Sequence, residues 1–459
     1  MNAAEKSELI RRGELSSLAL CEECVSRIAE NDQAGRELNA VACLCPDWRE
    51  QAKARDEAKD KERSKKLLYG LPVLVKDNIE VKGLPNTAGS YVLKDLICEK
   101  DSDIVRRLRE EGAVILGKTN LSEFAYWMSD EKMPSGYSSL AGQVRHPYNP
   151  AFDPSGSSSG SAVSVAAGYC DLAVGTETDG SLMSPAIANA ITAIKPTFGL
   201  LSNRGILPLS PVQDTAGPMA SSTKDCALLL SAMVSSTGKN RAADYTAALC
   251  SDLAGERIGV FTVKGAEDDE AALNRLKEII EDHGGEAVEC VLEQGIVDEE
   301  ECFKTEFKYG LNRYLKEQSC SVRSLKEIIE RNEADPERCL KYGQNLLIES
   351  EKTSGDLHNP AYAALRRRVK EEAEHLLFSL MEEKNLSSLV TVTNSVITNL
   401  AAVSGACSMT LPARVFNETV YDPLSFYLMA KPYRESNLIR LAYTLEQTLQ
   451  LRRRPSWRK

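Results

Sequence analysis

The feature that most constrains this chain is a run of small residues between positions 153 and 185. The run contains the letters PSGSSSGS and continues into an apolar stretch that predicts a strand and ends in GTETDGS. Small residues are needed where a backbone approaches a ligand closely, and a serine that ends a tight turn can lie beside backbone N–H groups that face a developing oxyanion. The pattern therefore indicates a catalytic turn, with Ser181 as the candidate nucleophile.

A serine nucleophile needs a base, and histidine, the usual base, is scarce in this chain. A neutral hydroxyl is a weak nucleophile until a neighbouring group takes its proton. Of the four histidines, three lie in charged segments with helical patterns, and His146 lies in the sequence RHPY. All four are expected to be surface or loop residues. The sequence therefore argues against a Ser-His-Asp triad.

Lysine is the other candidate base, because Lys76 stands where a predicted buried strand stops. The apolar run LPVLV reaches this residue and passes into a turn that contains Asp77 and Asn78. At an ordinary pKa of about 10.4, a lysine is neutral in about one molecule in 2,500 at pH 7, so burial must lower the pKa before the amine can act as a base. The alternative is a side chain that extends from the strand end into solvent.

Serine and lysine can exchange a proton directly or through a second hydroxyl. The run PSGSSSGS offers five hydroxyl groups for this relay, and the residues alone leave the choice among them open. The candidates are Ser155, Ser157, Ser158, Ser159 and Ser161.

Several segments together resemble the amidase signature family, and the resemblance covers roughly two thirds of the chain. Two segments of this chain resemble the family's signature itself: LAGQVRHPYNPAFDPSGSSSGSAVSVAAG and LAVGTETDGSLMSPAIANAITAIKPTFGLLSNRGILPLSPVQDTAGPMA. Three others resemble the strands and helices around the signature: GLPVLVKDNIEVKGLPNTAGS, GAVILGKTNLSEFA and, near the C-terminus, AKPYRESNLIRLAYTLEQ.

The resemblance implies a catalytic set of Lys76, Ser157 and Ser181, in which a cis peptide bond precedes Ser157. In the family the relay serine lies 24 residues before the nucleophile, and this spacing selects Ser157. The implied reaction is attack of Ser181 on an amide carbonyl, followed by hydrolysis of the acyl-enzyme and release of a carboxylate with ammonia or an amine. No metal and no other cofactor is implied.

A tight turn is predicted directly after the strand LAVGTE. Backbone N–H groups at Thr178, Asp179 and Gly180, together with that of Ser181, are expected to form the oxyanion hole of this turn.

The sequence GTETDGSLMSPA narrows the resemblance to one subgroup of the family. Asp179 stands where the family usually has glycine, and Met183 stands where it usually has arginine. Together with GSSSGSAV, QDTAGPMA and NPAYAAL, this sequence resembles those of bacterial peptide amidases. The implied function is deamidation of C-terminal peptide amides or related small amides.

Two other functions stay open. One is the amidase subunit of a tRNA-dependent amidotransferase, which would release ammonia from glutamine for a partner subunit. The second is a binding protein that keeps the amidase fold without catalysis.

Alternating strand and helix signals predict an α/β fold, and the resemblance implies the amidase signature fold, a twisted mixed β-sheet covered by helices on both faces. We expect one continuous domain with four parts. These are a helical N-terminal segment (1–65), the signature core (66–245), an α/β and helical region that shapes the substrate entrance (246–385), and the C-terminal part of the core (386–459).

One connection departs from the family pattern. Between the predicted strand 387–394 and the segment 401–413, the family usually carries a longer loop over the active site. The short connection 395–400 predicts a more open or reshaped pocket.

Composition excludes some partners. The net charge of −11 and the scattered lysines and arginines argue against a nucleic-acid partner. The only dense basic runs, LRRRVK and LRRRPSW, are expected to be solvated helix faces. No apolar segment is long enough to span a membrane, and the 13 scattered cysteines fit reduced thiols, so a cytoplasmic location is expected.

The pair Cys21 and Cys24 lies in a predicted helix, which argues against a zinc site. The expected partner is a small-molecule or peptide amide, and a homodimer stays an open alternative to a monomer.

Overall fold

The computed structural model describes residues 1–457 except 59–65, 235–243, 266–268 and 394–397. In this part of the chain, eleven strands form one large sheet in the order β1-β3-β2-β6-β8-β7-β12-β13-β11-β9-β10. In chain order the strands are β1 (Val41–Leu44), β2 (Pro72–Lys76), β3 (Val114–Thr119), β6 (Leu172–Glu177), β7 (Thr192–Lys195), β8 (Thr215–Ala220), β9 (Arg257–Val263), β10 (Glu286–Leu292), β11 (Ser388–Thr393), β12 (Cys407–Pro412) and β13 (Ser425–Ala430). A separate two-stranded sheet pairs β4 (Tyr137–Ser138) with β5 (Gly142–Gln143).

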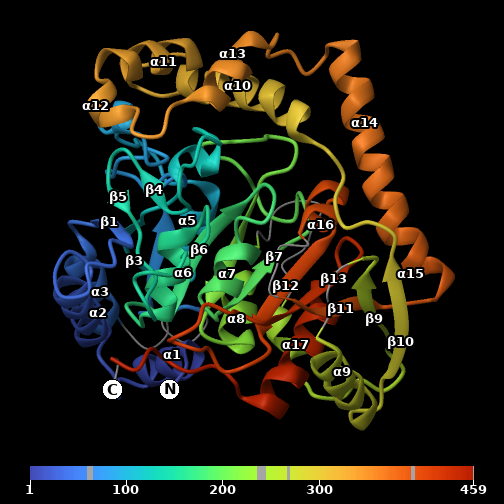
Figure 1. Ribbon diagram of the computed structural model, residues 1–459. Helices are drawn as coiled ribbons and strands as arrows, with labels where there is room; N and C mark the ends of the chain where they lie inside the picture. Colours follow the sequence, from blue (N-terminus) through green and yellow to red (C-terminus); the bar gives the residue numbers. More distant parts are fainter. Residues whose placement is uncertain (59–65, 235–243, 266–268, 394–397, 458–459) are drawn as a thin grey trace.

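The large sheet is mixed. Strand β2 runs parallel to β3 and β6, and β9 runs parallel to β10 and β11, whereas β8, β7, β12 and β13 pair antiparallel with their neighbours. Helices surround the sheet, so that the predicted α/β class with a mixed sheet is confirmed (Figure 1).

Many helices pack against or beside this sheet. They are α1 (Ala3–Arg11), α2 (Ser17–Asn31), α3 (Trp48–Glu57), α5 (Asp103–Glu110), α6 (Ser159–Ala166), α7 (Met183–Ala188), α8 (Thr223–Met233), α9 (Glu270–Asp282), α15 (Leu380–Glu383), α16 (Asn399–Ser404) and α17 (Glu435–Leu449), with the short turns η1 (Tyr91–Leu93), η2 (Glu123–Tyr126), η3 (Tyr245–Ala248) and η4 (His375–Ser379). Strand β9, helix α9 and strand β10 form the α/β part of the region 246–385.

The N-terminal segment differs from the expectation of helices alone. Residues 41–44 form the edge strand β1, which pairs antiparallel with β3 from Val41 to Leu44. These four apolar residues are too few to show a periodicity of their own, and they form a strand because β3 offers a free edge.

The parallel pair β2 and β6 positions the residues singled out by the sequence. Val75 lies opposite Val174, so both strands end at the same edge of the sheet, with Lys76 last in β2 and Glu177 last in β6. Carboxyl ends of neighbouring parallel strands are where α/β proteins place their sites.

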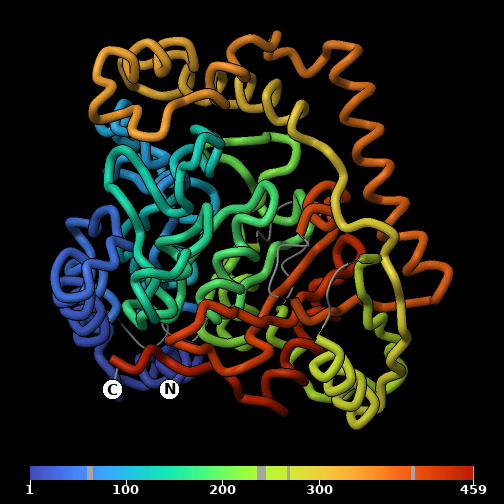
Figure 2. Tube along the Cα trace, in the orientation of Figure 1, coloured from blue at the N-terminus to red at the C-terminus, as the bar shows by residue number. Residues whose placement is uncertain are grey.

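A layer of helices lies above this edge (Figure 1). It contains α10 (Glu300–Glu317), α11 (Leu325–Ala334), α12 (Pro336–Cys339) and α13 (Asn345–Lys352), and the long helix α14 (Pro360–Glu374) descends from it along the outside of the molecule (Figure 2). Side chains of α10, among them Phe303 and Phe307, share a hydrophobic cluster with Phe124 and Trp127 of the core. Edge-to-face ring pairs join the two parts, with centroids 5.5 Å apart for Trp127 and Phe303.

None of the helices in the described residues has both the length and the apolar composition that crossing a membrane requires.

Candidate active site

A pocket of about 420 Å³ opens between the strand ends and the helical layer. Ser157 and Ser181 both line it, as do Thr178 and Asp179 of the predicted oxyanion turn. The structure thus brings the signature residues together with side chains that lie far away in the sequence. The remaining lining residues are Ala125, Tyr126, Trp127, Asp130, Ser135, Ser155, Gly156, Ser184, Leu209, Glu300, Phe303 and Leu346.

Lys76 is fully buried, so the alternative of a solvent-exposed strand end is wrong. Its Nζ donates to Ser157 Oγ at 2.8 Å, to Thr176 Oγ1 at 3.0 Å and to the Thr176 carbonyl at 3.3 Å. Burial lowers the pKa of Lys76 to about 7, although the carboxylates of Asp214 and Glu177 act in the opposite direction. A lysine with such a pKa is neutral in about half of the molecules at pH 7, which is what a base requires.

The structure also separates Ser157 from the other serines of its run. The hydroxyl of Ser158 donates to the Thr176 carbonyl at 3.0 Å, and that of Ser161 donates to the Val174 carbonyl at 3.1 Å. The Ser159 hydroxyl donates to the carbonyl of Ser155. The hydroxyl groups of Ser158 and Ser161 thus attach the start of α6 to β6, and that of Ser159 bonds to the preceding loop, whereas Ser157 is the serine bonded to Lys76.

The peptide bond between Gly156 and Ser157 is cis, as the family resemblance implies.

Ser181 lies on the turn between β6 and α7 and is 7% exposed. Gly180 has a φ of +74°, a conformation that glycine adopts without strain. The buried carboxylate of Glu177 accepts from the N–H groups of Leu182 at 2.7 Å and Met183 at 3.0 Å, which closes the turn at its base.

The backbone N–H groups of this turn are available to a ligand. Within the described residues, no hydrogen bond has the N–H of Asp179, Gly180 or Ser181 as its donor. Donors left without a protein partner beside a nucleophile can stabilise an oxyanion.

Further residues that support the turn could not be identified from the signature. The Thr178 hydroxyl donates to Asp214 at 2.5 Å, and Gln213 Nε2 donates to the Thr178 carbonyl at 2.8 Å. Burial raises the pKa of Asp214 to about 7. A signal did exist in the sequence, because Gln213 and Asp214 are polar residues directly before the buried strand β8.

The side chain of Asp179 is held from the C-terminal part of the chain. Thr398 Oγ1 donates to it at 2.9 Å and Asn399 Nδ2 at 3.0 Å, and burial raises its pKa. Both donors belong to the short connection 395–400, of which residues 395–397 lie outside the described residues. The prediction of a more open pocket therefore stays a prediction.

His146 is buried and not at the surface, although it does lie in a loop. Its ring Nε2 is 2.8 Å from the Ala188 carbonyl, and burial lowers its pKa to about 4. It packs against Tyr148 and Phe416 and does not line the serine pocket. The rings of Phe416 and Tyr421 also contact it from the C-terminal part of the chain, which the short sequence RHPY could not reveal.

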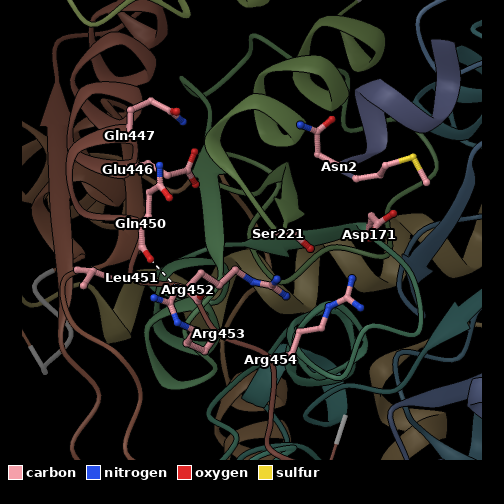
Figure 3. A pocket seen from close by; sticks show the side chains of 11 residues that line it. Asn2, Asp171, Ser221, Glu446, Gln447, Gln450, Leu451, Arg452, Arg453 and Arg454 are labelled. Atoms are coloured by element: carbon pink, nitrogen blue, oxygen red, sulfur yellow. Dashed lines mark hydrogen bonds between the residues drawn. The ribbon is translucent and has the colours of Figure 1, made fainter. Parts of the chain in front are cut away.

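A second pocket, of about 340 Å³, lies where the N-terminal and C-terminal segments meet (Figure 3). Arg452 and Arg454 point toward Asp171 and Ser221 there. It shares no lining residue with the serine pocket.

In the residues that the structure describes, no group of three or more histidine, cysteine, aspartate or glutamate side chains is arranged to hold a metal ion. Cys21 and Cys24, which both lie in α2, therefore do not belong to such a group.

Known proteins resemble this chain over nearly its whole length. A family described as Amidase matches residues 19–333. The solved structure of a peptide amidase from Stenotrophomonas maltophilia superposes with a TM-score of 0.91 at 35% identity, over 99% of this chain and 98% of that chain. A probable amidase from Arabidopsis thaliana is 35% identical over 440 residues, which are 92% of this chain and 85% of that protein. One component of the glutamyl-tRNA(Gln) amidotransferase from Roseiflexus castenholzii is 37% identical, over 64% of this chain and 60% of that protein.

Proposed function

The chain belongs to the amidase signature family and is an amide-hydrolysing enzyme, and from this premise we propose that Ser181 is its nucleophile, with Ser157 as proton relay and Lys76 as base. The observation that carries the proposal is the 2.8 Å contact between the buried amine of Lys76 and Ser157 Oγ, in a pocket that Ser181 also lines.

In the proposed reaction, Ser181 Oγ attacks the carbonyl carbon of the amide. Its proton passes to Ser157 Oγ as the Ser157 proton passes to neutral Lys76 Nζ. The same relay, run in reverse, protonates the nitrogen, so that the carbon–nitrogen bond breaks and ammonia or an amine leaves. A water molecule then attacks the acyl-enzyme with its proton taken through the same relay, which releases the carboxylate and restores Ser181.

The negative charge that develops on the carbonyl oxygen needs donors that are already in place. We assign this role to the backbone N–H groups at Thr178, Asp179, Gly180 and Ser181, where Glu177 holds the turn closed. Removing one oxyanion-hole donor typically costs about 3 to 4 kcal/mol in the transition state.

The substrate class that the pocket supports best is a peptide amide or a related small amide. Trp127, Phe303 and Leu346 are large apolar side chains of the pocket lining, and Asp130, Asp179 and Glu300 are its acidic side chains. No lysine or arginine is among the described lining residues. A peptide whose C-terminal carboxyl is amidated carries no negative charge at the bond to be cleaved and fits this lining.

The same charge distribution argues against a glutamine-dependent amidotransferase. Free glutamine carries an α-carboxylate, which a basic side chain would recognise best. Met183, in place of the usual arginine, is buried and supplies no charge. The likeness to the amidotransferase component also covers less of the chain than the likeness to a peptide amidase. A cytoplasmic location and a homodimer remain predictions from the sequence.

The test compares the wild-type enzyme with Ser181→Ala and with the control Ser155→Ala, a second serine of the same pocket. Ammonia release is measured with C-terminally amidated peptides, amino-acid amides and glutamine. We expect release from amidated peptides that Ser181→Ala abolishes and Ser155→Ala retains. Equal activity of Ser181→Ala and the wild type would refute the assignment of the nucleophile, and release from glutamine alone would favour the amidotransferase function.

A further inference from the structure

A buried charged cluster lies behind the oxyanion turn, and it is built largely by the helical segment 296–385. Arg366 of α14 pairs with Glu299 Oε2 at 3.3 Å and with Glu306 Oε1 at 3.5 Å. Their side chains are 13%, 5% and 0% exposed, respectively. We call these three residues the Arg366 cluster.

The cluster reaches the oxyanion turn through one glutamine. Arg366 donates to Gln213 Oε1, and Gln213 Nε2 donates to the Thr178 carbonyl at 2.8 Å and to Glu299 Oε1 at 3.2 Å. Because a guanidinium can only donate, it determines which end of the Gln213 amide faces it. The NH₂ group of Gln213 must then face the two acceptors, the Thr178 carbonyl and the Glu299 carboxylate.

A second connection runs from the same cluster to the next residue of the turn. Asn399 Nδ2 donates to Glu299 Oε1 at 3.1 Å and to Asp179 Oδ2 at 3.0 Å. Thr178 and Asp179, the residues of the turn that lie three and two positions before Ser181, are therefore both connected to Glu299 of this cluster.

Helix α14 has few other buried anchors. Of its fifteen residues, only Val369 and Ala373 are buried, and the helix runs along the outside of the molecule (Figure 1). Tyr362 adds a hydrogen bond from its hydroxyl to Glu306 Oε1 at 2.6 Å. The contacts of Arg366 thus link an exposed helix to the centre of the active site.

We propose that Arg366 is a positioning residue for amide hydrolysis, which through Gln213 holds the turn 178–180 in the geometry that stabilises the oxyanion. The inference rests on the proposed function of the Ser181 site. Without Arg366, the carboxylates of Glu299 and Glu306 lose their cationic partner and the Gln213 amide is free to rotate, so that the Thr178 carbonyl loses its fixed donor.

The experiment compares Arg366→Met with Arg368→Met, an exposed arginine on the same helix. Both kcat and KM are measured with an amidated peptide, and the active sites are counted with a serine-directed phosphonate. Displacing a catalytic group by a fraction of an ångström to 1 Å costs up to about a hundredfold in rate, so we expect Arg366→Met to lower kcat about 10- to 100-fold per titrated site with KM nearly unchanged. Arg368→Met should match the wild type.

A second variant keeps the Arg366 ion pairs intact. Gln213→Leu removes the donor to the Thr178 carbonyl, and it should lower kcat in the same way even if Arg366→Met fails to fold. Combined with Arg366→Met, it should add little, because both act on one connection. Arg366→Lys, which retains the charge, should recover part of the kcat.

Wild-type kcat per titrated site in both Arg366→Met and Gln213→Leu would overturn the inference, as would a rise in KM alone. If these variants are unaffected while the wild type is active and Ser181→Ala is not, the proposed function stands and only the role of Arg366 falls. If the wild type neither releases ammonia nor reacts with the phosphonate, the proposed function is overturned and this inference with it.

Discussion

Two regions meet at the serine pocket, and they contribute to it by different physical means. The strand ends and turns between residues 70 and 185 supply Lys76, Ser157 and Ser181, which lie close together because parallel strands end at one edge of the sheet. The helical segment 296–385 supplies the walls Phe303 and Leu346 and the buried cation Arg366. The first region carries the proposed reacting groups, and the second contributes side chains to the lining of the pocket around them.

The difference shows in the burial of charge. In the strand region, hydroxyl and carbonyl groups hold the amine of Lys76, and no carboxylate of the described residues contacts it directly, so that burial lowers its pKa to about 7. In the helical region, Arg366 is paired with two carboxylates, which stabilise its charge. A buried amine without a paired anion loses its proton more easily and can then act as a base. A buried guanidinium that is paired with carboxylates keeps its charge and connects the segments that carry them.

The largest expected effect is that of removing the base. Lys76→Met should lower kcat about a thousandfold or more. General base catalysis is commonly worth 10²- to 10⁴-fold, and Lys76 is the proposed base that takes the proton from Ser157. The folded protein should remain stable, since a buried amine is replaced by an apolar side chain of similar length. Steady-state kinetics and thermal unfolding measure the two quantities.

A matched variant in the same region is Lys118→Met. Lys118 is also fully buried, but it pairs with Asp77 at 3.1 Å, so its loss should reduce stability more than the Lys76 substitution does. The comparison fails if Lys76→Met keeps more than about a tenth of the wild-type kcat.

The second effect is on the pH dependence. The lowered pKa of Lys76, about 7, places its loss of the proton near neutrality. Only the neutral amine can accept a proton, so kcat/KM should rise with pH up to about 7 and should fall about tenfold for each pH unit below pH 6. Rates measured from pH 5 to 9 with a neutral amide check this.

An acid limb that continues to rise toward pH 10 would mean that Lys76 keeps its ordinary pKa and is not the base. Arg366→Met should lower the whole profile without moving its midpoint, because Arg366 does not contact Lys76.

A smaller effect is expected from the wall that the helical layer contributes. Phe303→Ala should raise KM for amides with a bulky apolar group roughly tenfold, because a lost aromatic contact is worth about 1 to 2 kcal/mol, and should leave kcat close to that of the wild type. Small amino-acid amides serve as the control, since they fill less of the pocket. A fall in kcat with unchanged KM would mean that the helical layer also orders the reacting groups at this position.

The smallest effect concerns the exposed charge at the pocket. Glu300 pairs with Lys304 at 3.1 Å, and its side chain is 57% exposed, so water screens it. We expect Glu300→Gln to change KM for a cationic peptide amide by less than about threefold and to leave KM for a neutral one unchanged. A tenfold change, measured in the same assay at low and high salt, would show that this carboxylate recognises substrate directly.

Much of the core could be anticipated from the sequence because its signals are local. An apolar run that stops at Lys76 predicts a buried strand end, and the turn after LAVGTE follows from the glycine and small residues around Ser181. The strand at 41–44 was missed because four residues form a strand only when a neighbouring edge is available. The burial of His146 was missed for a similar reason, since two of the rings that pack against it, Phe416 and Tyr421, come from a distant segment.

The sequence by itself indicated the strand ends, the tight turn and the candidates Ser181 and Lys76, because each of these signals depends on a few neighbouring residues. The choice of Ser157 as relay came from the spacing that the family resemblance implies. Only the tertiary structure decided that Lys76 is buried and bonded to Ser157, and that Gln213 and Asp214 bond to Thr178. It also decided that Arg366 donates to Gln213. Burial and electrostatic pairing depend on what the rest of the chain places around a side chain. Arg366 reaches Thr178 only through Gln213, which lies 153 positions before Arg366 in the chain.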